Sequence, residues 1–309
     1  MPKLSIIVVS YNTRAETLAC LRSIKKETNV SYELIVVDNA STDGSADAIA
    51  AEFSDCVLMA ETENHGFAKA NNLAAEHAKG DYLLLLNPDT VVLDHAIDKL
   101  LNFAEQQPGA RIWGGRTLYD DMSLNPSSCW RQFTFWSVFC RTTGLTGIFP
   151  RSPIFNAEAY GGWDRSTQRQ VDIVSGCFFL IRADDWQTLN GFDLTFFMYG
   201  EEADLCLRAR RSLGAAPMVT PDATIIHYGG ISETVRADRQ VKVLRAKGEL
   251  MNRYFPVWQQ PVARLLFAAY PLSRYLFGRV WVRRGRGETH RIWHEVWQRR
   301  QEWVNGFAE

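Results

Sequence analysis

The sequence lacks several features that would place a protein in a common class at once. Its six cysteines form no C-x-x-C pair, which argues against a disulfide framework or zinc site and favours reduced thiols in a cytoplasmic protein. The formal net charge is −1, so bulk charge predicts no nucleic-acid partner. The first apolar run, residues 4–9, is too short for a signal peptide, and no uncharged run is long enough to cross a bilayer.

Glycine-rich phosphate loops are absent as well. The first apolar run leads into Ser10-Tyr11-Asn12 rather than G-x-G-x-x-G, and the chain contains no G-x-x-x-x-G-K-[ST] segment. A nucleotide bound at this position would therefore need a metal ion or Arg side chains to neutralise its phosphates. A sugar nucleotidyltransferase, which would be expected to carry such a phosphate loop here, is the less favoured enzyme class.

The first third of the 309 residues alternates apolar strands with short helices. The predicted strands are 4–10, 33–38, 56–59 and 82–86, and the predicted helices are 14–27, 47–53, 67–79 and 94–106. This alternation predicts right-handed β-α-β units and an α/β fold with a Rossmann-like, mostly parallel sheet flanked by helices. Thr13 and Asp94 are the expected helix N-caps, and Gly80 is the expected helix end.

The rest of the chain is less regular. Residues 116–169 are rich in glycine, proline and aromatic residues, which predicts a long excursion with little regular structure. Regular structure is expected again in strands 171–181 and 223–227 and in helices 183–189, 201–212 and 236–254.

Acidic residues stand where the predicted sheet would present them at one edge. Asp38 ends one strand, and Asn87-Pro88-Asp89 follows another that is apolar throughout. Since the carboxyl ends of parallel strands share an edge, these side chains are expected to converge in a ligand-binding crevice. Asp89 offers a hard oxygen ligand for Mg²⁺ or Mn²⁺, and His227, at the end of a later strand, is a further metal or phosphate ligand.

A third acidic group opens the helix at residue 201. Glu201 and Asp204 share one face of this helix, and Glu202 points elsewhere. Each of these groups also has an ordinary explanation as a turn former, a cap or a charge complementing the helix dipole. Spacing alone leaves these alternatives open.

Taken together, these motifs resemble the family 2 inverting glycosyltransferases of GT-A fold, especially bacterial rhamnosyltransferase-like members. The matching segments occur in the order of the family, and their combination is far more specific than any single one. They are residues 5–12, 36–45, 64–68, 71–72, 85–89, 175–182, 191–193, 196–208 and 226–228.

The resemblance implies roles for individual residues. The donor site would contain Ser10, Tyr11, Asn12, Asp38, Asn64, Gly66, Asn71 and Asn87, with Asp38 accepting a hydrogen bond from a pyrimidine ring. Asn87-Pro88-Asp89 resembles the Asp-x-Asp element of the family, so Asp89, with His227, would hold Mg²⁺ or Mn²⁺ on the donor diphosphate. The catalytic base aligns with Glu202, where relatives usually carry Asp, and Asp204 and Glu201 remain rivals.

By this resemblance the chain transfers a sugar, rhamnose or another hexose, from a dTDP- or UDP-sugar to a hydroxyl of a glycan or polyprenyl-diphosphate-linked glycan. Residues 1–255 would form the GT-A domain, with a donor half at 1–113 and an acceptor and catalytic-base half at 114–255. Cell-surface polysaccharide synthesis is the expected process. A non-catalytic subunit that binds nucleotide-sugar is the alternative, although such a relative should have lost its base.

Residues 256–309 are predicted to form a basic, tryptophan-rich helical extension. From residue 262 onward it contains nine Arg, four Glu and the residues Trp281, Trp293, Trp297 and Trp303. Arginine is attracted to anionic lipid, and tryptophan prefers the headgroup level, so the extension is expected to bind the cytoplasmic face of the inner membrane. Packing of these helices on the catalytic domain and a homodimer contact are the alternatives.

Overall fold

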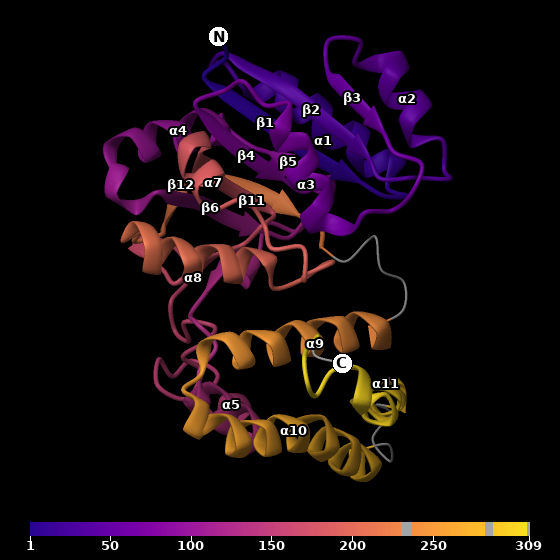
Figure 1. Cartoon of the computed structure of the whole chain (residues 1–309), viewed down its shortest axis with the longest axis vertical. Helices are drawn as coiled ribbons and strands as arrows, with labels where there is room; N and C mark the ends of the chain where they lie inside the picture. The colour runs from indigo at the N-terminus through magenta and orange to yellow at the C-terminus, as the bar shows by residue number, and fades with distance from the viewer. Residues whose placement is uncertain (230–235, 282–286, 308–309) are drawn as a thin grey trace. The chain divides into compact units, whose positions relative to one another are not determined.

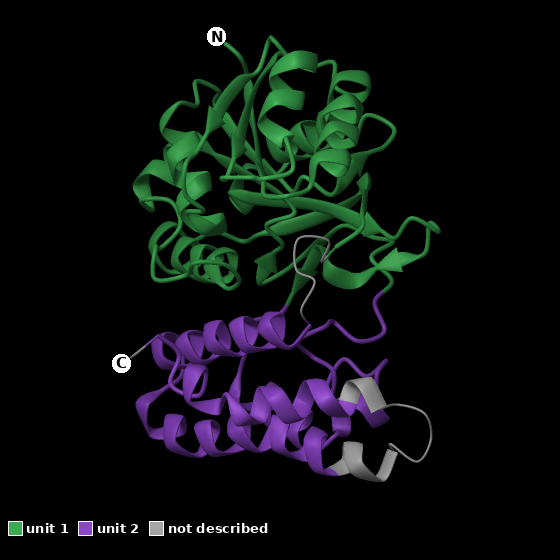
Figure 2. Cartoon of the chain, turned by 90° about the vertical axis from the view of Figure 1, so that its right-hand side faces the viewer, with its two compact units in different colours: residues 1–130, 164–232 green, residues 131–163, 233–309 purple. Residues whose placement is uncertain are grey.

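The computed structural model of the chain describes residues 1–229, 236–281 and 287–307. The chain divides into two compact units (Figure 2). Unit 1 contains residues 1–130 and 164–232, and unit 2 contains residues 131–163 and 233–309. Residues 131–163 of the long excursion and the helix predicted at 236–254 thus belong with the C-terminal extension, whereas residues 116–130 and 164–169 belong to unit 1. The functional division at residues 113 and 255 stays a prediction.

Unit 1 is built on one large sheet (Figure 1). Its main strands follow the order β3-β2-β1-β4-β11-β6-β12-β5. In chain order their bounds are β1 (Leu4–Ser10), β2 (Tyr32–Asp38), β3 (Val57–Ala60), β4 (Tyr82–Leu86), β5 (Thr90–Val92), β6 (Ile112–Leu118), β11 (Phe178–Arg182) and β12 (Met218–His227). Two short strands extend this sheet, β7 (Leu124–Asn125) beside β6 and β9 (Arg169–Gln170) beside β12, while β8 (Cys129–Trp130) and β10 (Ile173–Val174) pair separately.

The directions of the strands confirm the predicted parallel arrangement for the N-terminal part of the sheet. β1 pairs in parallel with β2 and β4, and β2 pairs in parallel with β3. β11 then runs antiparallel to both β4 and β6, which makes the sheet mixed as a whole. Because β12 is parallel to β6, its carboxyl end returns to the same edge as that of β4.

Helices cover both faces of this sheet. They are α1 (Arg14–Glu27), α2 (Ser45–Glu52), α3 (Gly66–Glu76), α4 (Ala96–Gln106), α7 (Ala183–Thr188) and α8 (Glu201–Leu213). Leu21 of α1 and Leu100 of α4 belong to a core cluster with Ile6 and Val8 of β1. Ile7, which alternates with them, is equally buried and faces the side where α3 packs on β1. Burial on both faces explains why these strands are apolar throughout.

Three local expectations were wrong. Gly80 does not end a helix, because α3 stops at Glu76; instead a Cβ on Gly80 would lie 2.5 Å from the backbone nitrogen of Ser5. Asp94 does not cap α4, whose N-cap is His95; its carboxylate pairs with Lys99. The strand predicted at 171–181 is interrupted by a turn at residues 175–177. Thr13 does stand at the N-cap of α1, but its side chain makes no capping hydrogen bond.

Unit 2 is a helical assembly with its own core. Its helices are α5 (Phe135–Thr142), α6 (Leu145–Ile148), α9 (Arg236–Tyr254), α10 (Gln260–Trp281) and α11 (Gly287–Gln298). The excursion therefore contains two helices where little regular structure was expected. The core joins Val138 of α5, Leu244 of α9, Phe267 of α10 and Val296 of α11, with Trp303 fully buried among them.

All six cysteines are unpaired, and five of them are buried. Across the described helices, none combines the length and the apolar character that a bilayer crossing requires.

Candidate functional site

The carboxyl edge of the unit 1 sheet gathers most of the predicted site residues. Asp38 is the last residue of β2 and pairs in register with Ser10, the last residue of β1. Asn87 directly follows β4 and donates its backbone N–H to the carbonyl of Cys177, at the start of the antiparallel β11. His227 ends β12, which points the same way as β4. The topology therefore brings these positions to a single edge.

Asp38 is a buried carboxylate with one oxygen unsatisfied. Its Oδ2 accepts a hydrogen bond from the backbone N–H of Ser41 at 3.2 Å. Its Oδ1 is buried and has no hydrogen-bond partner among the described residues. Since a buried acceptor without a partner costs free energy, this oxygen is ready to receive a donor such as a ring N–H of a bound base.

The loop after β1 is tied to the loop after β2. Asn12 has a positive φ of 52°, and its side-chain oxygen accepts from the backbone N–H of Thr42 at 2.8 Å. Its own N–H donates to the hydroxyl of Ser41 at 2.9 Å. Tyr11 is exposed beside it, while Ser10 is fully buried with its hydroxyl 2.8 Å from that of Thr17. The Ser10 side chain thus links the end of β1 to α1.

Asn39 fixes the loop that contains Asn64 and Gly66. Its side-chain amide donates to the Asn64 side-chain oxygen at 3.0 Å and to the Gly66 carbonyl at 3.2 Å, and its oxygen accepts from the His65 N–H. Gly66 has a φ of +74°, and a Cβ there would lie 2.4 Å from the carbonyl oxygen of Phe197. Only glycine fits this close approach without strain.

Asn71 is buried in the first turns of α3, where its amide donates to the Phe67 carbonyl at 2.8 Å. Its neighbour Asn72 exchanges two hydrogen bonds with the backbone of Phe192, each of 2.9 Å. Asn72 therefore holds the turn at Gly191-Phe192-Asp193 against α3.

Asp89 and His227 form the predicted metal pair. They meet because β5 pairs antiparallel with β12, with His227 opposite Thr90 in register. His227 Nε2 lies 3.4 Å from Asp89 Oδ1, and Asp89 Oδ2 accepts from the Gly229 N–H at 2.9 Å. Both side chains are buried. Burial lowers the pKa of His227, but the nearby Cys177 and Asp89 raise it to about 10.

Asp89 and His227 could bind a divalent ion, but few other ligands surround them in the part of the chain that the structure describes. Asn87 adds an amide 3.4 Å from His227 Nε2. Among the described residues there is no group of three or more His, Cys, Asp or Glu side chains arranged to hold a metal. The described residues therefore offer a divalent ion the Asp89 carboxylate and, once the His227 ring has given up its proton to solvent, an imidazole; a bound ion would complete its shell with donor phosphates and water.

Glu201 and Glu202 are buried at the start of α8, and each has an Oε2 without a partner among the described residues. Burial raises the pKa of Glu202; for Glu201, burial and the charge of Glu202 raise it well above the usual value. A Cβ built on Gly176 would lie 3.9 Å from the Cβ of Glu202 and 3.3 Å from the ring of Phe67. Glu202 thus stands beside the turn before β11, at the same edge as Asp38 and Asp89.

Asp204 is in a different environment from Glu202. Its carboxylate accepts a hydrogen bond from Arg208 Nε at 2.6 Å, one helical turn further along α8. Arg208 also donates to the carbonyls of Leu189 and Gly191. Because Asp204 is committed to this ion pair, its position favours a structural role over that of a base.

Three residues that support the site were not predicted from the sequence. Asn39 orders the 64–66 loop, Arg208 engages Asp204, and Gly229 donates to Asp89. The i, i+4 spacing of Asp204 and Arg208 on a helix was a readable signal. Asn39 and Gly229 contact residues far away in the sequence, and no local sequence pattern predicts such contacts.

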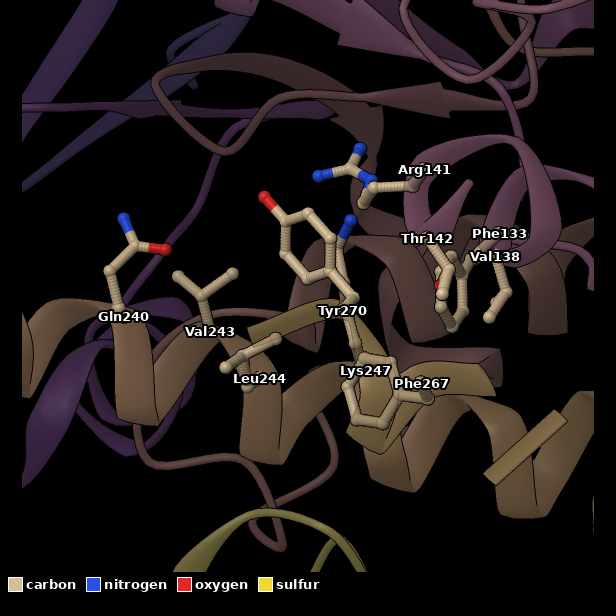
Figure 3. A pocket seen from close by; sticks show the side chains of 10 residues that line it. All are labelled: Phe133, Val138, Arg141, Thr142, Gln240, Val243, Leu244, Lys247, Phe267 and Tyr270. Carbon is tan, nitrogen blue, oxygen red and sulfur yellow. The ribbon is translucent and has the colours of Figure 1, made fainter. Parts of the chain in front are cut away.

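Unit 2 contains a cavity of about 40 Å³ lined by none of the predicted site residues. Figure 3 shows Arg141, Lys247 and Tyr270 among its lining side chains. Glu158 binds both cations, with Arg141 at 2.9 Å and Lys247 in close contact. Burial alone would raise the pKa of Glu158, but the two cations lower it to about 2. This network ties the 131–163 segment to α9.

Comparisons with known proteins agree with this geometry. Residues 5–186 match the family model described as glycosyl transferase family 2. An N-acetylglucosaminyl-diphospho-decaprenol L-rhamnosyltransferase of Mycobacterium tuberculosis is 27% identical over 297 residues, covering 92% of this chain and 95% of that protein. The rhamnosyltransferase WbbL of Escherichia coli K12 is 32% identical over 249 residues, covering 72% of this chain and 82% of that protein.

Among solved structures, the mannosyltransferase PcManGT of Pyrobaculum calidifontis, in complex with GDP-Man and Mn²⁺, shares the fold. Its TM-score is 0.57 at 17% identity, with 99% of this chain and 86% of that chain covered. The expected α/β architecture is confirmed. The chain belongs to glycosyl transferase family 2 and is a glycosyltransferase of GT-A fold.

Proposed function

We propose that this glycosyltransferase acts by a metal-dependent, inverting mechanism, with a dTDP- or UDP-sugar as donor and a lipid-linked glycan as acceptor. The observation that supports the proposal is that three features share one sheet edge: Asp38 with an unpartnered carboxylate oxygen, the contact between Asp89 and His227, and the buried Glu202, whose Oε2 has no partner among the described residues. Rhamnose is the favoured sugar, because two relatives are named rhamnosyltransferases.

Donor binding would use groups that are already in place. The Asp38 Oδ1 without a partner would accept from the pyrimidine, and Asn12 and Tyr11 stand on the adjoining loop. Asn64, Gly66 and Asn71 lie on the segment that Asn39 fixes and on the start of α3. Preorganised polar groups lose little freedom when a ligand binds, which favours affinity.

Asp89 and His227 would hold the Mg²⁺ or Mn²⁺, with Asn87 beside them. When bound, such an ion neutralises charge that develops on the leaving diphosphate. The Mn²⁺ in the mannosyltransferase structure supports a divalent ion in this fold. The absence of a glycine-rich phosphate loop in the sequence supports the same requirement.

Glu202 would act as the base. Its Oε2 would accept the proton of the acceptor hydroxyl while the hydroxyl oxygen attacks the anomeric carbon and the bond to the diphosphate breaks. Burial raises the pKa of Glu202, which strengthens it as a base. Asp204 and Glu201 remain the rivals; the Arg208 ion pair makes Asp204 the weaker one.

The acceptor proposal rests on a relative. The mycobacterial enzyme is named for a diphospho-decaprenol-linked sugar, so we infer a polyprenyl-diphosphate-linked glycan and a part in cell-surface polysaccharide synthesis. A lipid-linked acceptor would place the protein at the cytoplasmic face of the membrane. A homodimer stays a prediction.

The test compares the intact protein with Asp89→Ala. Binding of dTDP-rhamnose, UDP-glucose and UDP-N-acetylglucosamine is measured by calorimetry with Mn²⁺ and with EDTA. We expect one nucleotide-sugar to bind in a Mn²⁺-dependent manner, and this dependence to disappear in the variant. Binding that is equally tight in EDTA would contradict the metal-dependent mechanism.

A further inference from the structure

Unit 2 exposes an apolar surface on and before α10. Val257 and Trp258, just before the helix, are 81% and 78% exposed. Within the helix, Val262, Leu265 and Leu276 are 53%, 71% and 49% exposed. Single exposed apolar residues are common on proteins, but five in one segment indicate a surface that contacts something apolar.

The three exposed helical residues form one stripe together with two half-buried ones, Ala269 and Leu272. Val262, Leu265, Ala269, Leu272 and Leu276 recur at spacings of three and four residues, which places them on one face of α10. Ala263 and Phe267, on the opposite side, are buried in the unit 2 core. The helix is therefore apolar on two faces, and within the described part of unit 2 only one of them is covered. We call Val257, Trp258 and this stripe the α10 face.

Charge separates the two units sharply. The sequence of unit 2 contains 18 Lys and Arg and eight Asp and Glu, a net charge of +10. The sequence of unit 1 contains 16 Lys and Arg and 27 Asp and Glu, a net charge of −11. The net charges of the two units add up to the −1 of the whole chain. A unit of this charge is attracted to anionic surfaces, and two copies of it repel each other.

We propose that unit 2 docks on an anionic lipid surface through the α10 face. Leu265 and Leu276 enter the boundary of the acyl chains, Trp258 lies at headgroup level, and the cationic side chains of the unit supply long-range attraction. The contact is shallow, since α10 does not qualify as a membrane-crossing helix. The proposal deepens the proposed function, because a lipid-linked acceptor would be presented at the same surface.

This assignment differs from the one that the sequence predicted. Trp303 is fully buried and is therefore unavailable to lipid in this fold, and Trp293 is half-buried against the same core. The aromatic residue at the proposed surface is Trp258, which lies in the predicted extension but before the four tryptophans that the sequence singled out. Deleting residues 262–309 would remove Phe267, Val296 and Trp303 from the core. Truncation is therefore a poor test, and point substitutions on the α10 face are required.

The experiment uses the full chain and sedimentation with vesicles of phosphatidylglycerol and phosphatidylcholine, or of phosphatidylcholine alone. The variants are Trp258→Gln and the double substitution Leu265→Gln with Leu276→Gln. Met122→Gln is the matched control, because Met122 is 57% exposed on unit 1. We expect the intact protein and the control to bind anionic vesicles, and each α10-face variant to bind at least about tenfold more weakly.

Two further readouts separate the outcomes. Thermal unfolding of each variant should match the intact protein, since the substituted side chains are exposed. Nucleotide-sugar binding by the variants should also be unchanged. Failure of the intact protein to bind any nucleotide-sugar, with its vesicle binding retained, would count against the proposed function and not against the docking surface. Equal vesicle binding by the α10-face variants would overturn the inference. So would conversion of a dimer to a monomer by these variants with vesicle binding intact, which would assign the face to a second copy.

Discussion

At the scale of single residues, the environment of each carboxylate distinguishes side chains that look alike in the sequence. Asp89 is beside His227, Asp204 is paired with Arg208, and Glu202 has an oxygen without a partner among the described residues. All three are buried. Burial raises the pKa of Glu202, whereas the carboxylate of Asp204 is occupied by its hydrogen bond from Arg208 Nε.

Replacing Glu202 by Gln should lower kcat by about a hundred- to ten-thousand-fold, because the amide cannot accept the acceptor proton. Donor affinity should be retained, as should the melting temperature. The measurement is release of nucleoside diphosphate, together with calorimetric donor binding. In the intact protein, kcat should fall with decreasing pH as Glu202 protonates, with a midpoint above the ordinary Glu value of 4.5 because burial raises its pKa.

Asp204→Ala is the companion variant. It leaves Arg208, which also holds the Leu189 and Gly191 carbonyls, without its carboxylate. We expect a loss of about 3 kcal/mol in the free energy of unfolding, as for a broken buried ion pair. Urea denaturation measures it. If Asp204→Ala keeps its stability and loses turnover, while Glu202→Gln stays active, Asp204 is the base.

At the scale of elements, the donor side of the site depends on loops held by contacts between distant parts of the chain. The 64–66 loop is bonded to Asn39 on one side and approaches the backbone of Phe197 on the other. The loop after β1 is bonded to residues 41 and 42. Both loops are thus anchored by hydrogen bonds to the residues that directly follow β2, which favours a site whose polar groups are in place before a ligand binds.

Gly66→Ala tests this rigidity. The new Cβ would meet the Phe197 carbonyl at 2.4 Å, in a backbone conformation with φ of +74°. We expect a loss of about 2 kcal/mol or more in stability and weaker donor binding. Gly144→Ala is the control, since Gly144 has a φ of +82° but nothing within 4 Å of its Cβ position. Equal effects of the two substitutions would mean that backbone strain, and not close approach, explains Gly66.

At the scale of the whole molecule, a near-neutral chain consists of one acidic and one basic unit. The basic unit is assembled from two separate stretches of sequence, 131–163 and 233–309. Glu158 joins them by binding Arg141 of the first stretch and Lys247 of α9. One half-buried carboxylate thus holds together segments that are distant in sequence and stabilises the unit that carries the proposed lipid surface.

Glu158→Gln should destabilise the protein by about 2 kcal/mol at neutral pH, since it leaves two half-buried cations without their carboxylate. Because the folded pKa of Glu158 is lowered to about 2, this contribution is present above the unfolded value of about 4.5 and is lost as the pH falls towards 2. Denaturation curves of the two proteins should therefore converge over that range. Glu302→Gln, which breaks a half-exposed pair with Arg299, is the control and should cost less than about 1 kcal/mol. A constant difference across this pH range would contradict the assignment.

Much of the fold could be predicted because its signals are local. Apolar runs predicted β1, β2 and β4, and helical spacing predicted α1, α8 and α9. The ends of the predicted strands indicated Asp38 and Asp89 as site residues. β5 and β6 were missed, since three residues and a run containing two glycines give little periodic signal. Gly80 was misassigned because a glycine required by close packing and one that ends a helix look the same in sequence.

By itself, the sequence determined the family, the alternation of strands and helices, and which polar side chains follow which strands, because these are properties of neighbouring residues. Only the tertiary structure decided which groups are paired and which are left open. The register of β5 on β12 places His227 beside Asp89. Packing buries Trp303 and leaves Trp258 exposed. Arg208 binds Asp204 rather than Glu202. These outcomes depend on contacts between residues far apart in the chain. The free energies of such contacts cannot be predicted from patterns among neighbouring residues.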